Sequence, residues 1–308
     1  MRSTLLPLVL RYVDQVARSG SIQGASKELH VAASAINRQI LQLEEELGVP
    51  LFERLPRGMR LTSSGASIVT LARRWKADER RTADDIKQMQ GIHQGQLKLA
   101  VMDSHTTSFL PGFVYELAEK HPRISLTLEV RSPDDALAAL ASDQADLAVV
   151  FNAPPRRDLH VTWQSDLPFG CIVAPGHPLA LAGSASLQEV CSHPIALQSK
   201  SLLIRRYLES RYSWLLTDTH NRVETNSLQL VKMLVRGGRY VAFTSELDAA
   251  AELADGSLVF VPVRDKGVEA QTVSLVINAA RPLTPVMKVV EGLLEAHIGQ
   301  CLDRARAA

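Results

Sequence analysis

The chain has 308 residues, of which 46% are hydrophobic, and its formal net charge is +1. This length predicts two or three domains, and the apolar fraction is sufficient for a hydrophobic core in each. No run of about 20 apolar residues and no signal-peptide pattern is found, so we expect neither a membrane span nor secretion.

The charge is unevenly distributed, because residues 1–90 carry +4 and the remainder carries −3. A basic first part suggests that only this part meets a polyanion such as nucleic acid. Cys171, Cys191 and Cys301 are odd in number and far apart, which predicts free thiols in a reducing cytoplasm. The nine histidines show no metal-ligand spacing, so we expect no metal or other cofactor.

Residues 1–62 begin with three short helices. The first ends at Gly20, and Ser21 can cap the second, which runs to about residue 29. After a tight turn at 30–31, the third helix runs to about residue 47. Two helices separated by three or four residues have the spacing of a helix-turn-helix. The predicted apolar face of the third helix consists of Ile36, Ile40, Leu43 and Leu47.

The other face of the third helix is small and polar in its first two turns, at Ala33, Ser34, Asn37 and Arg38. In a helix-turn-helix the second helix of the pair enters the DNA major groove, and its N-terminal residues meet base edges. Asparagine can pair with adenine, and arginine with guanine or phosphate. The alternative is a solvated three-helix bundle in which Asn37 and Arg38 are merely exposed.

A β-hairpin follows, because the runs PLFERL and MRLT flank the turn residues PRG. It carries Arg54, Arg57 and Arg60. Beside a helix-turn-helix such a hairpin is a wing whose arginines can reach phosphates or the minor groove. For any single arginine, an ordinary surface hairpin is the alternative.

The segment GSIQGASKELHVAASAINRQILQLEEELGVPLFERLPRGMRLTSSG resembles the N-terminal domain of the LysR-type transcriptional regulators. The ordered motifs A-S-K-E-L-H-V, N-R-Q-I, L-E-E-E-L-G, L-F-E-R and L-T-x-x-G carry the resemblance. It implies a winged helix-turn-helix DNA-binding domain over residues 1–62. Ala33 and Ser34 depart from the family, in which most members carry a larger polar residue and a proline, so the base preference stays open.

Residues 63–90 contain no proline, and no glycine after Gly65, so one helix about 40 Å long is expected. Apolar residues that repeat with a period of seven form a seam along this helix, and the seam is interrupted in its middle. Either this helix packs on its own domain or a second chain covers the seam. The resemblance implies the second alternative, a dimer formed through paired linker helices, and usually a tetramer. The seam consists of Ile68, Ala72, Trp75, Ile86 and Met89.

After a hinge at 91–96, strand and helix patterns alternate over residues 95–308. This order predicts an α/β body in two lobes, with a parallel sheet in the first. We place lobe 1 at about 95–165 and 269–308, and lobe 2 at about 166–268. Strand C-termini and helix N-termini that converge between two such lobes form a binding crevice.

The resemblance extends more loosely to this body, which is similar to periplasmic solute-binding proteins, and implies an effector between the lobes. Ser104 and Ser227 are expected to begin helices, where an anion is favoured, although such serines are often only caps. Asp103 would repel an anionic effector, pair with a cationic or hydroxylated one, or point to solvent. The expected lining is Met102, Asp103, Ser104, Phe151, Asn152, Asn226, Ser227, Thr244 and Ser245.

These features together predict a transcriptional regulator that binds operator DNA as a dimer or tetramer and responds to a small effector. The resemblance implies RNA polymerase as a further partner. A transport solute-binding protein is one alternative, which the basic N-terminal part opposes. An enzyme with Cys171 or Asp103 as catalytic residue is another, although no nucleophile–base pair is visible and Cys171 fits a core strand. The effector and the operator are left open.

Overall fold

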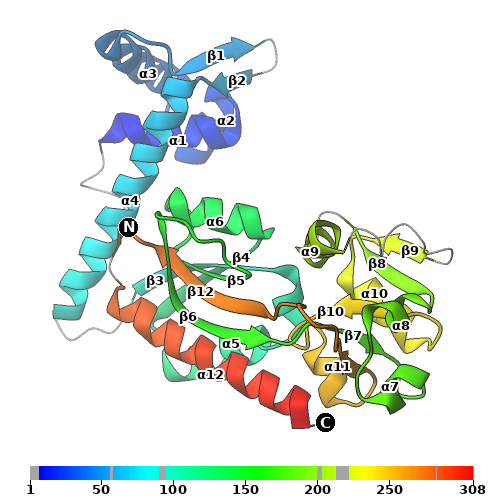
Figure 1. The fold of residues 1–308 in the computed structure, drawn as a ribbon. Coiled ribbons are helices and arrows are strands. Elements are labelled where there is room, and N and C mark those ends of the chain that lie inside the picture. Colours follow the sequence, from blue (N-terminus) through cyan, green and yellow to red (C-terminus); the bar gives the residue numbers. More distant parts are fainter. Residues whose placement is uncertain are drawn as a thin grey trace. The chain divides into compact units, whose positions relative to one another are not determined.

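The computed structural model describes residues 7–55, 58–89, 95–199, 203–212, 222–281 and 283–307. The chain divides into two compact units (Figure 1). The N-terminal unit comprises residues 1–93 with 142–144, and the body comprises residues 94–141 and 145–308. No helix in the described part of the chain has both the length and the hydrophobicity needed to cross a bilayer.

The N-terminal unit contains three helices, a hairpin and a long helix. Gly20 adopts a left-handed conformation, with φ 68°, and ends the first helix. The Ser21 side chain then accepts a hydrogen bond from the Gly24 N–H and begins the second helix, as predicted. The elements are α1 (Leu8–Ser19), α2 (Ile22–Leu29), α3 (Ala33–Leu47), β1 (Phe52–Leu55), β2 (Gly58–Leu61) and α4 (Ser63–Met89).

The core of this unit joins α1 and α3 to the start of the hairpin. Val13 and Ile36 are fully buried, and Ile40 and Leu51 are nearly or fully so. Leu47 was expected on the same apolar face, but it is 45% exposed, so that prediction is wrong. Along α3 the fully buried positions end at Ile40, and Leu43 is only partly buried.

Backbone contacts fix the hairpin to the helices. The Met59 N–H donates to the Gly20 carbonyl at 2.8 Å, beside Gly58, whose φ of 124° favours glycine. A Cβ at Gly65 would lie 1.9 Å from the Leu51 carbonyl oxygen, so only glycine fits at the start of α4. These contacts attach β2 to the end of α1, and the residue before β1 to the start of α4.

Helix α4 is as long as predicted, but its apolar seam divides. Ile68 and the buried Ala72 pack against α1 in the same unit. Trp75 is 43% exposed and Ile86 is 52% exposed. Packing on the unit itself therefore accounts for the first part of the seam only, and the side chain of Met89 lies outside the described residues.

Lobe 1 of the body contains a five-stranded sheet in the order β4-β3-β5-β12-β6. Strand β3 is parallel to β4 and β5, as expected, but β12 runs antiparallel to both β5 and β6. The sheet is mixed because the chain returns from lobe 2 in the opposite direction. Its strands are β3 (Gly95–Val101), β4 (Ile124–Val130), β5 (Leu147–Phe151), β6 (Leu159–Leu167) and β12 (Gln271–Asn278).

Helices cover the two faces of this sheet unequally (Figure 1). Helices α5 (Leu110–Lys120) and α12 (Pro285–Ala307) form the larger core with one face. The nine-residue α6 (Pro133–Ala141) covers part of the other. Because α6 is short, it leaves β12 and β6 less covered on this face of the sheet.

Lobe 2 contains an antiparallel sheet, β10-β7-β11, and a parallel pair, β8-β9, joined by a bridge between Ile195 and Val241. Several short elements here were not predicted from the sequence: β8, β11, α7, α8 and α11. The bounds are β7 (Gly170–Val173), α7 (Pro178–Ala182), α8 (Leu187–Cys191), β8 (Ile195–Gln198), α9 (Leu203–Arg211), β9 (Arg222–Thr225), α10 (Leu228–Arg236), β10 (Ala242–Thr244), α11 (Ala250–Ala254) and β11 (Val259–Pro262).

Candidate DNA-binding surface and effector site

The exposed side of α3 carries the four residues that the sequence singled out. Ser34 and Arg38 are exposed, and Ala33 and Asn37 are half-buried. The residue before the helix, Ala32, supplies no side-chain cap. The first N–H groups of α3 therefore remain available to an acceptor, as at the end of a helix that approaches DNA.

The turn before α3 is fixed by local hydrogen bonds. The Ser26 hydroxyl donates to the Val31 carbonyl at 2.7 Å, and the Val31 N–H donates back to the Ser26 carbonyl at 3.3 Å. His30 occupies the left-handed region with φ 54°. These contacts set the angle between α2 and α3, which determines how α3 is presented.

The hairpin arginines have partners within the N-terminal unit. Arg54 Nη2 donates to Asn37 Oδ1 at 2.9 Å, so the wing and the recognition helix are directly connected. Arg60 Nη2 lies 2.6 Å from Glu53 Oε2 on the neighbouring strand. Arg57 lies outside the described residues. The sequence predicted the exposure of Arg54 and Arg60 but neither pairing.

Glu44 in α3 has a structural role that the sequence did not reveal. Its Oε1 accepts the Leu51 N–H at 2.7 Å and the Phe52 N–H at 3.1 Å. These are the backbone donors at the start of β1. The neighbouring Glu45 and Glu46 are exposed, so only one of the three acidic residues stabilises the hairpin.

In the body, the predicted effector residues divide by exposure. Met102, Ser104, Phe151, Thr244 and Ser245 are buried. In contrast, Asp103, Asn226 and Ser227 are exposed. The exposure of Asp103 agrees with the alternative in which its carboxylate points to solvent.

Two of the predicted residues already have hydrogen-bond partners, and a third has another place in its helix than predicted. The Ser227 hydroxyl accepts the Leu230 N–H at 3.2 Å and caps α10. Asn152 is left-handed, with φ 48°, and its Oδ1 accepts the Thr272 N–H at 2.8 Å. Ser104 lies inside the short 3-10 helix η1 (Asp103–Thr107), after the N-cap Met102. Ser104 is thus the second residue of the helix, and Met102 rather than Ser104 occupies the cap position.

A buried lysine joins the lobes, which sequence reasoning missed. Lys232 in α10 is 1% exposed, and its Nζ lies 2.8 Å from Glu252 Oε1. The same ammonium donates to Thr107 Oγ1 in η1 at 3.4 Å, and Gln229 donates there at 3.1 Å. Lys232 and Thr107 are 125 residues apart along the chain, so no local sequence signal could reveal the contact between the lobes.

Burial raises the pKa of the Asp248 carboxyl group, which lies beside this junction. Hydroxyls of Ser104, Thr244 and Ser245 oppose the shift, and Thr244 Oγ1 donates to Asp248 Oδ2 at 3.1 Å. Ser104 Oγ and Asp248 Oδ1 are both buried, and neither makes a well-formed hydrogen bond with a described residue, although Ser104 lies near enough to Asp248 to affect its pKa. The junction thus brings together one incompletely hydrogen-bonded polar atom from each lobe.

His105, next to Ser104, is completely buried between Phe109 and Phe151. Burial lowers the pKa of its imidazole to about 3, so the ring is neutral. Its Nδ1 accepts the Met102 N–H at 3.2 Å, which orients the end of β3.

The thiols do not have the properties of nucleophiles. Cys171 is a fully buried core residue, as expected, and burial raises the pKa of its thiol to about 12. Burial likewise raises the pKa of Cys191 to about 11. The thiolate is the reactive form, and it is suppressed at both positions. No cluster of His, Cys, Asp and Glu in the described ranges could hold a metal ion.

Both parts of the chain match known families. Residues 9–66 match the bacterial regulatory helix-turn-helix protein, lysR family, and residues 90–299 match the LysR substrate binding domain. The HTH-type transcriptional activator CmpR of Synechocystis is 25% identical over 248 residues, which are 80% of this chain and 81% of that protein. The RuBisCO operon transcriptional regulator of Allochromatium vinosum is 28% identical over 255 residues, 82% and 84% of the two chains.

Solved structures share the fold. A full-length OxyR variant from Pseudomonas aeruginosa has a TM-score of 0.71 at 21% identity, covering 94% of this chain and 93% of that one. Full-length CbnR in complex with its target DNA has a TM-score of 0.60 at 17% identity, covering 95% and 98%. The alternatives of a transport protein and of an enzyme explain neither the DNA-binding unit nor these matches. The chain belongs to the LysR family of DNA-binding transcriptional regulators, with a helix-turn-helix domain and an effector-binding domain.

Proposed function

We propose that this regulator reads operator DNA with the first half of α3, and that its hairpin contributes phosphate or minor-groove contacts. The exposed Ser34 and Arg38, the half-buried Asn37 and the uncapped start of α3 support this role. Binding to DNA makes the cytoplasm the expected location. RNA polymerase is the proposed partner at the regulated promoter.

Helix α4 is the proposed dimerisation element. Leu71, Trp75 and Ile86 expose 46%, 43% and 52% of their surfaces, although they are large apolar residues. A second copy of α4 would remove them from water. The resulting homodimer, or a tetramer of two such dimers, would present two copies of α3 to a two-fold symmetric site.

The body is proposed to bind a small polar effector between the lobes. The observation that carries this proposal is a pair of buried polar atoms without a well-formed hydrogen bond, Ser104 Oγ of lobe 1 and Asp248 Oδ1 of lobe 2. A buried polar atom without a hydrogen bond is costly, so a ligand that supplies partners is favoured. The raised pKa of Asp248 favours its protonated form, which can both donate and accept.

The response to the effector would follow from differential binding to two arrangements of the lobes. The lobes are already connected by the Lys232–Thr107 hydrogen bond and by ion pairs from Arg206 to Asp134 and from Arg306 to Glu246. An effector that strengthens or breaks these contacts would bias one arrangement. The bias would be transmitted to the spacing of the DNA-binding units.

A thermal-shift screen of the purified protein tests the effector site. At about 100 times its Kd, a ligand adds roughly 2.7 kcal/mol, which is about 5–10 °C for a body of this size. The panel would contain small carboxylates, amino acids, sugars and aromatic compounds. A hit that Ser104→Ala weakens, while Glu45→Ala in the N-terminal unit leaves it unchanged, supports the site. A hit that is insensitive to Ser104→Ala and to Asn226→Leu contradicts it.

A further inference from the structure

A hollow of about 480 Å³ lies in lobe 1, built only from residues of that lobe. It occupies the sheet face that α6 covers incompletely, over strands β6 and β12, beneath the connection from β5 to β6. None of the predicted effector residues lines it. Its volume falls in the range of about 300–1,000 Å³ that is typical of small-molecule sites.

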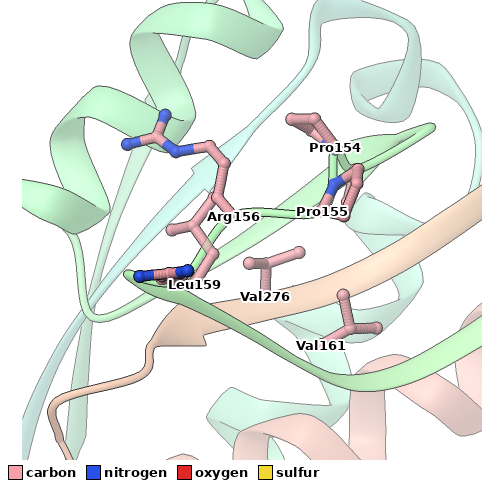
Figure 2. A pocket seen from close by; sticks show the side chains of 8 residues that line it. Pro154, Pro155, Arg156, Leu159, Val161 and Val276 are labelled. Carbon is pink, nitrogen blue, oxygen red and sulfur yellow. The ribbon is translucent and has the colours of Figure 1, made fainter.

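The floor and one wall of this hollow are apolar. Leu159, Val161 and Val276 form the floor, and Figure 2 shows Val161 and Val276 beneath Pro154 and Pro155 of the connection. Val161, on the edge strand β6, is 38% exposed, so the floor of the hollow is accessible to a ligand. The prolines have a fixed φ and no N–H donor, so this wall is rigid and offers a ligand only apolar contact and carbonyl oxygens.

The polar part of the hollow is cationic. Arg156 is neutralised locally, because its Nε and Nη2 donate to the two carboxylate oxygens of Asp158 at 3.0 and 2.5 Å. Arg157, the next residue, has no hydrogen-bond or ion-pair partner in the part of the chain that the structure describes. An uncompensated guanidinium thus borders an apolar hollow.

We propose that this hollow is a second ligand site, separate from the inter-lobe effector site, for a small carboxylate with an apolar body. The guanidinium of Arg157 matches a carboxylate in shape and charge. The valines and prolines would remove the apolar body from water. The rigid wall keeps the site formed in the absence of ligand, which reduces the entropy lost on binding.

The position of the hollow gives it a route to the rest of the body. Pro154 lies two residues after Asn152, whose backbone and side chain both bond to Thr272 on β12. Asn152 also follows Phe151, which packs on the His105 ring in the core beside η1. A ligand that contacts Pro154 and Pro155 in the connection from β5 to β6 therefore contacts a segment that is bonded to β12 at the end of β5.

Binding can be measured on the full-length protein by ligand-observed NMR titration with three probes. Hexanoate has the charge and the apolar body, 1-hexanol has the body alone, and acetate has the charge alone. We expect saturable hexanoate binding, with the other two at least about tenfold weaker. Arg157→Gln should weaken hexanoate about tenfold and leave 1-hexanol unchanged, whereas Val161→Gln should weaken both.

Two control variants locate the binding. Arg123→Gln removes an exposed arginine elsewhere in lobe 1, and Asn226→Leu alters the proposed effector site; neither should change hexanoate binding. The proposal is overturned if no hexanoate saturation occurs up to about 10 mM, or if Arg157→Gln and Val161→Gln leave binding unchanged. Loss of binding in Asn226→Leu alone would also overturn it, since the ligand would then occupy the effector site.

Discussion

Arg54 Nη2 in the hairpin donates a hydrogen bond to Asn37 Oδ1 in the recognition helix α3, at 2.9 Å. With its oxygen side occupied by a guanidinium, the amide presents its NH2 group outward. A donor reads acceptors in the major groove, such as guanine O6 and N7 or thymine O4. The two-bond contact with adenine, expected from the sequence, requires the oxygen as well.

Removing Arg54 should therefore change which base is preferred, in addition to weakening binding. We expect Arg54→Ala to increase the preference for adenine at one position of the operator half-site. Asn37→Ala should abolish the preference there, at a cost of about 1–3 kcal/mol. Selection from a randomised duplex library with the full-length variants measures both effects.

Arg60→Ala is the matched control, because Arg60 lies on the same hairpin but pairs with Glu53. It should lower affinity for all sequences and reduce the salt dependence by about one ion. The same base preference in Arg54→Ala and in the unmodified protein would show that Arg54 does not position Asn37.

Glu44 should be far more important for stability than its two acidic neighbours. Its carboxylate accepts two backbone N–H groups at the start of β1, and hydrogen bonds to a charged group contribute about 1.5–3 kcal/mol. Urea unfolding of the N-terminal unit should show a loss of this size for Glu44→Ala. Glu45→Ala, at an exposed position, should change the free energy of unfolding by less than about 0.5 kcal/mol. Equal effects of the two substitutions would rule out the proposed role.

The ion pair of Lys232 with Glu252 should show strong coupling. Glu252→Gln leaves a buried ammonium without its counter-charge, which typically costs about 3–5 kcal/mol. In the double variant Lys232→Met with Glu252→Gln, the unpaired charge is absent, so the body should regain much of its stability. A double-mutant cycle from denaturant unfolding gives the coupling. Additive losses would mean that the two groups do not depend on each other.

His105 should make the body less stable in mild acid. The pKa of the folded imidazole is about 3, whereas an unfolded histidine titrates near its ordinary value of 6.5. Between about pH 6.5 and pH 3, His105 binds a proton in the unfolded chain but stays neutral in the folded protein. Stability is thus lost as the pH falls from about 6.5 toward 3, by up to about 1.4 kcal/mol per pH unit.

The test is the difference in unfolding free energy between the unmodified protein and His105→Asn, measured from pH 7 to pH 4.5. Asparagine retains an acceptor for the Met102 N–H but does not titrate. The difference should shift in favour of the variant as the pH falls. A difference that does not change with pH would mean that His105 is protonated in the folded body.

Elements whose ends are fixed by neighbouring residues could be predicted from the sequence. Gly20 and Ser21 determine the boundary between α1 and α2 through local hydrogen bonds, and the structure confirms both. The burial of Cys171 in a strand was also predictable, because its neighbours are apolar on both sides.

Contacts between distant segments could not be predicted. Nothing near Lys232 in the sequence indicates Thr107 or Glu252, and nothing near Glu44 indicates that it meets the start of β1. The prediction for Leu47 failed for a related reason. A regular apolar spacing shows which side of a helix faces the core but not how far the core extends along it.

The order of strands in lobe 1 also determines when each part of the protein can fold during synthesis. Strand β12 (Gln271–Asn278) lies between β5 and β6, so the sheet lacks an interior strand until nearly all of the chain has left the ribosome. The α1–α3 bundle and its hairpin are complete within the first 61 residues. A nascent chain can thus hold a folded DNA-binding part before its sensor exists, and truncation before β12 would leave that part without a folded lobe 1.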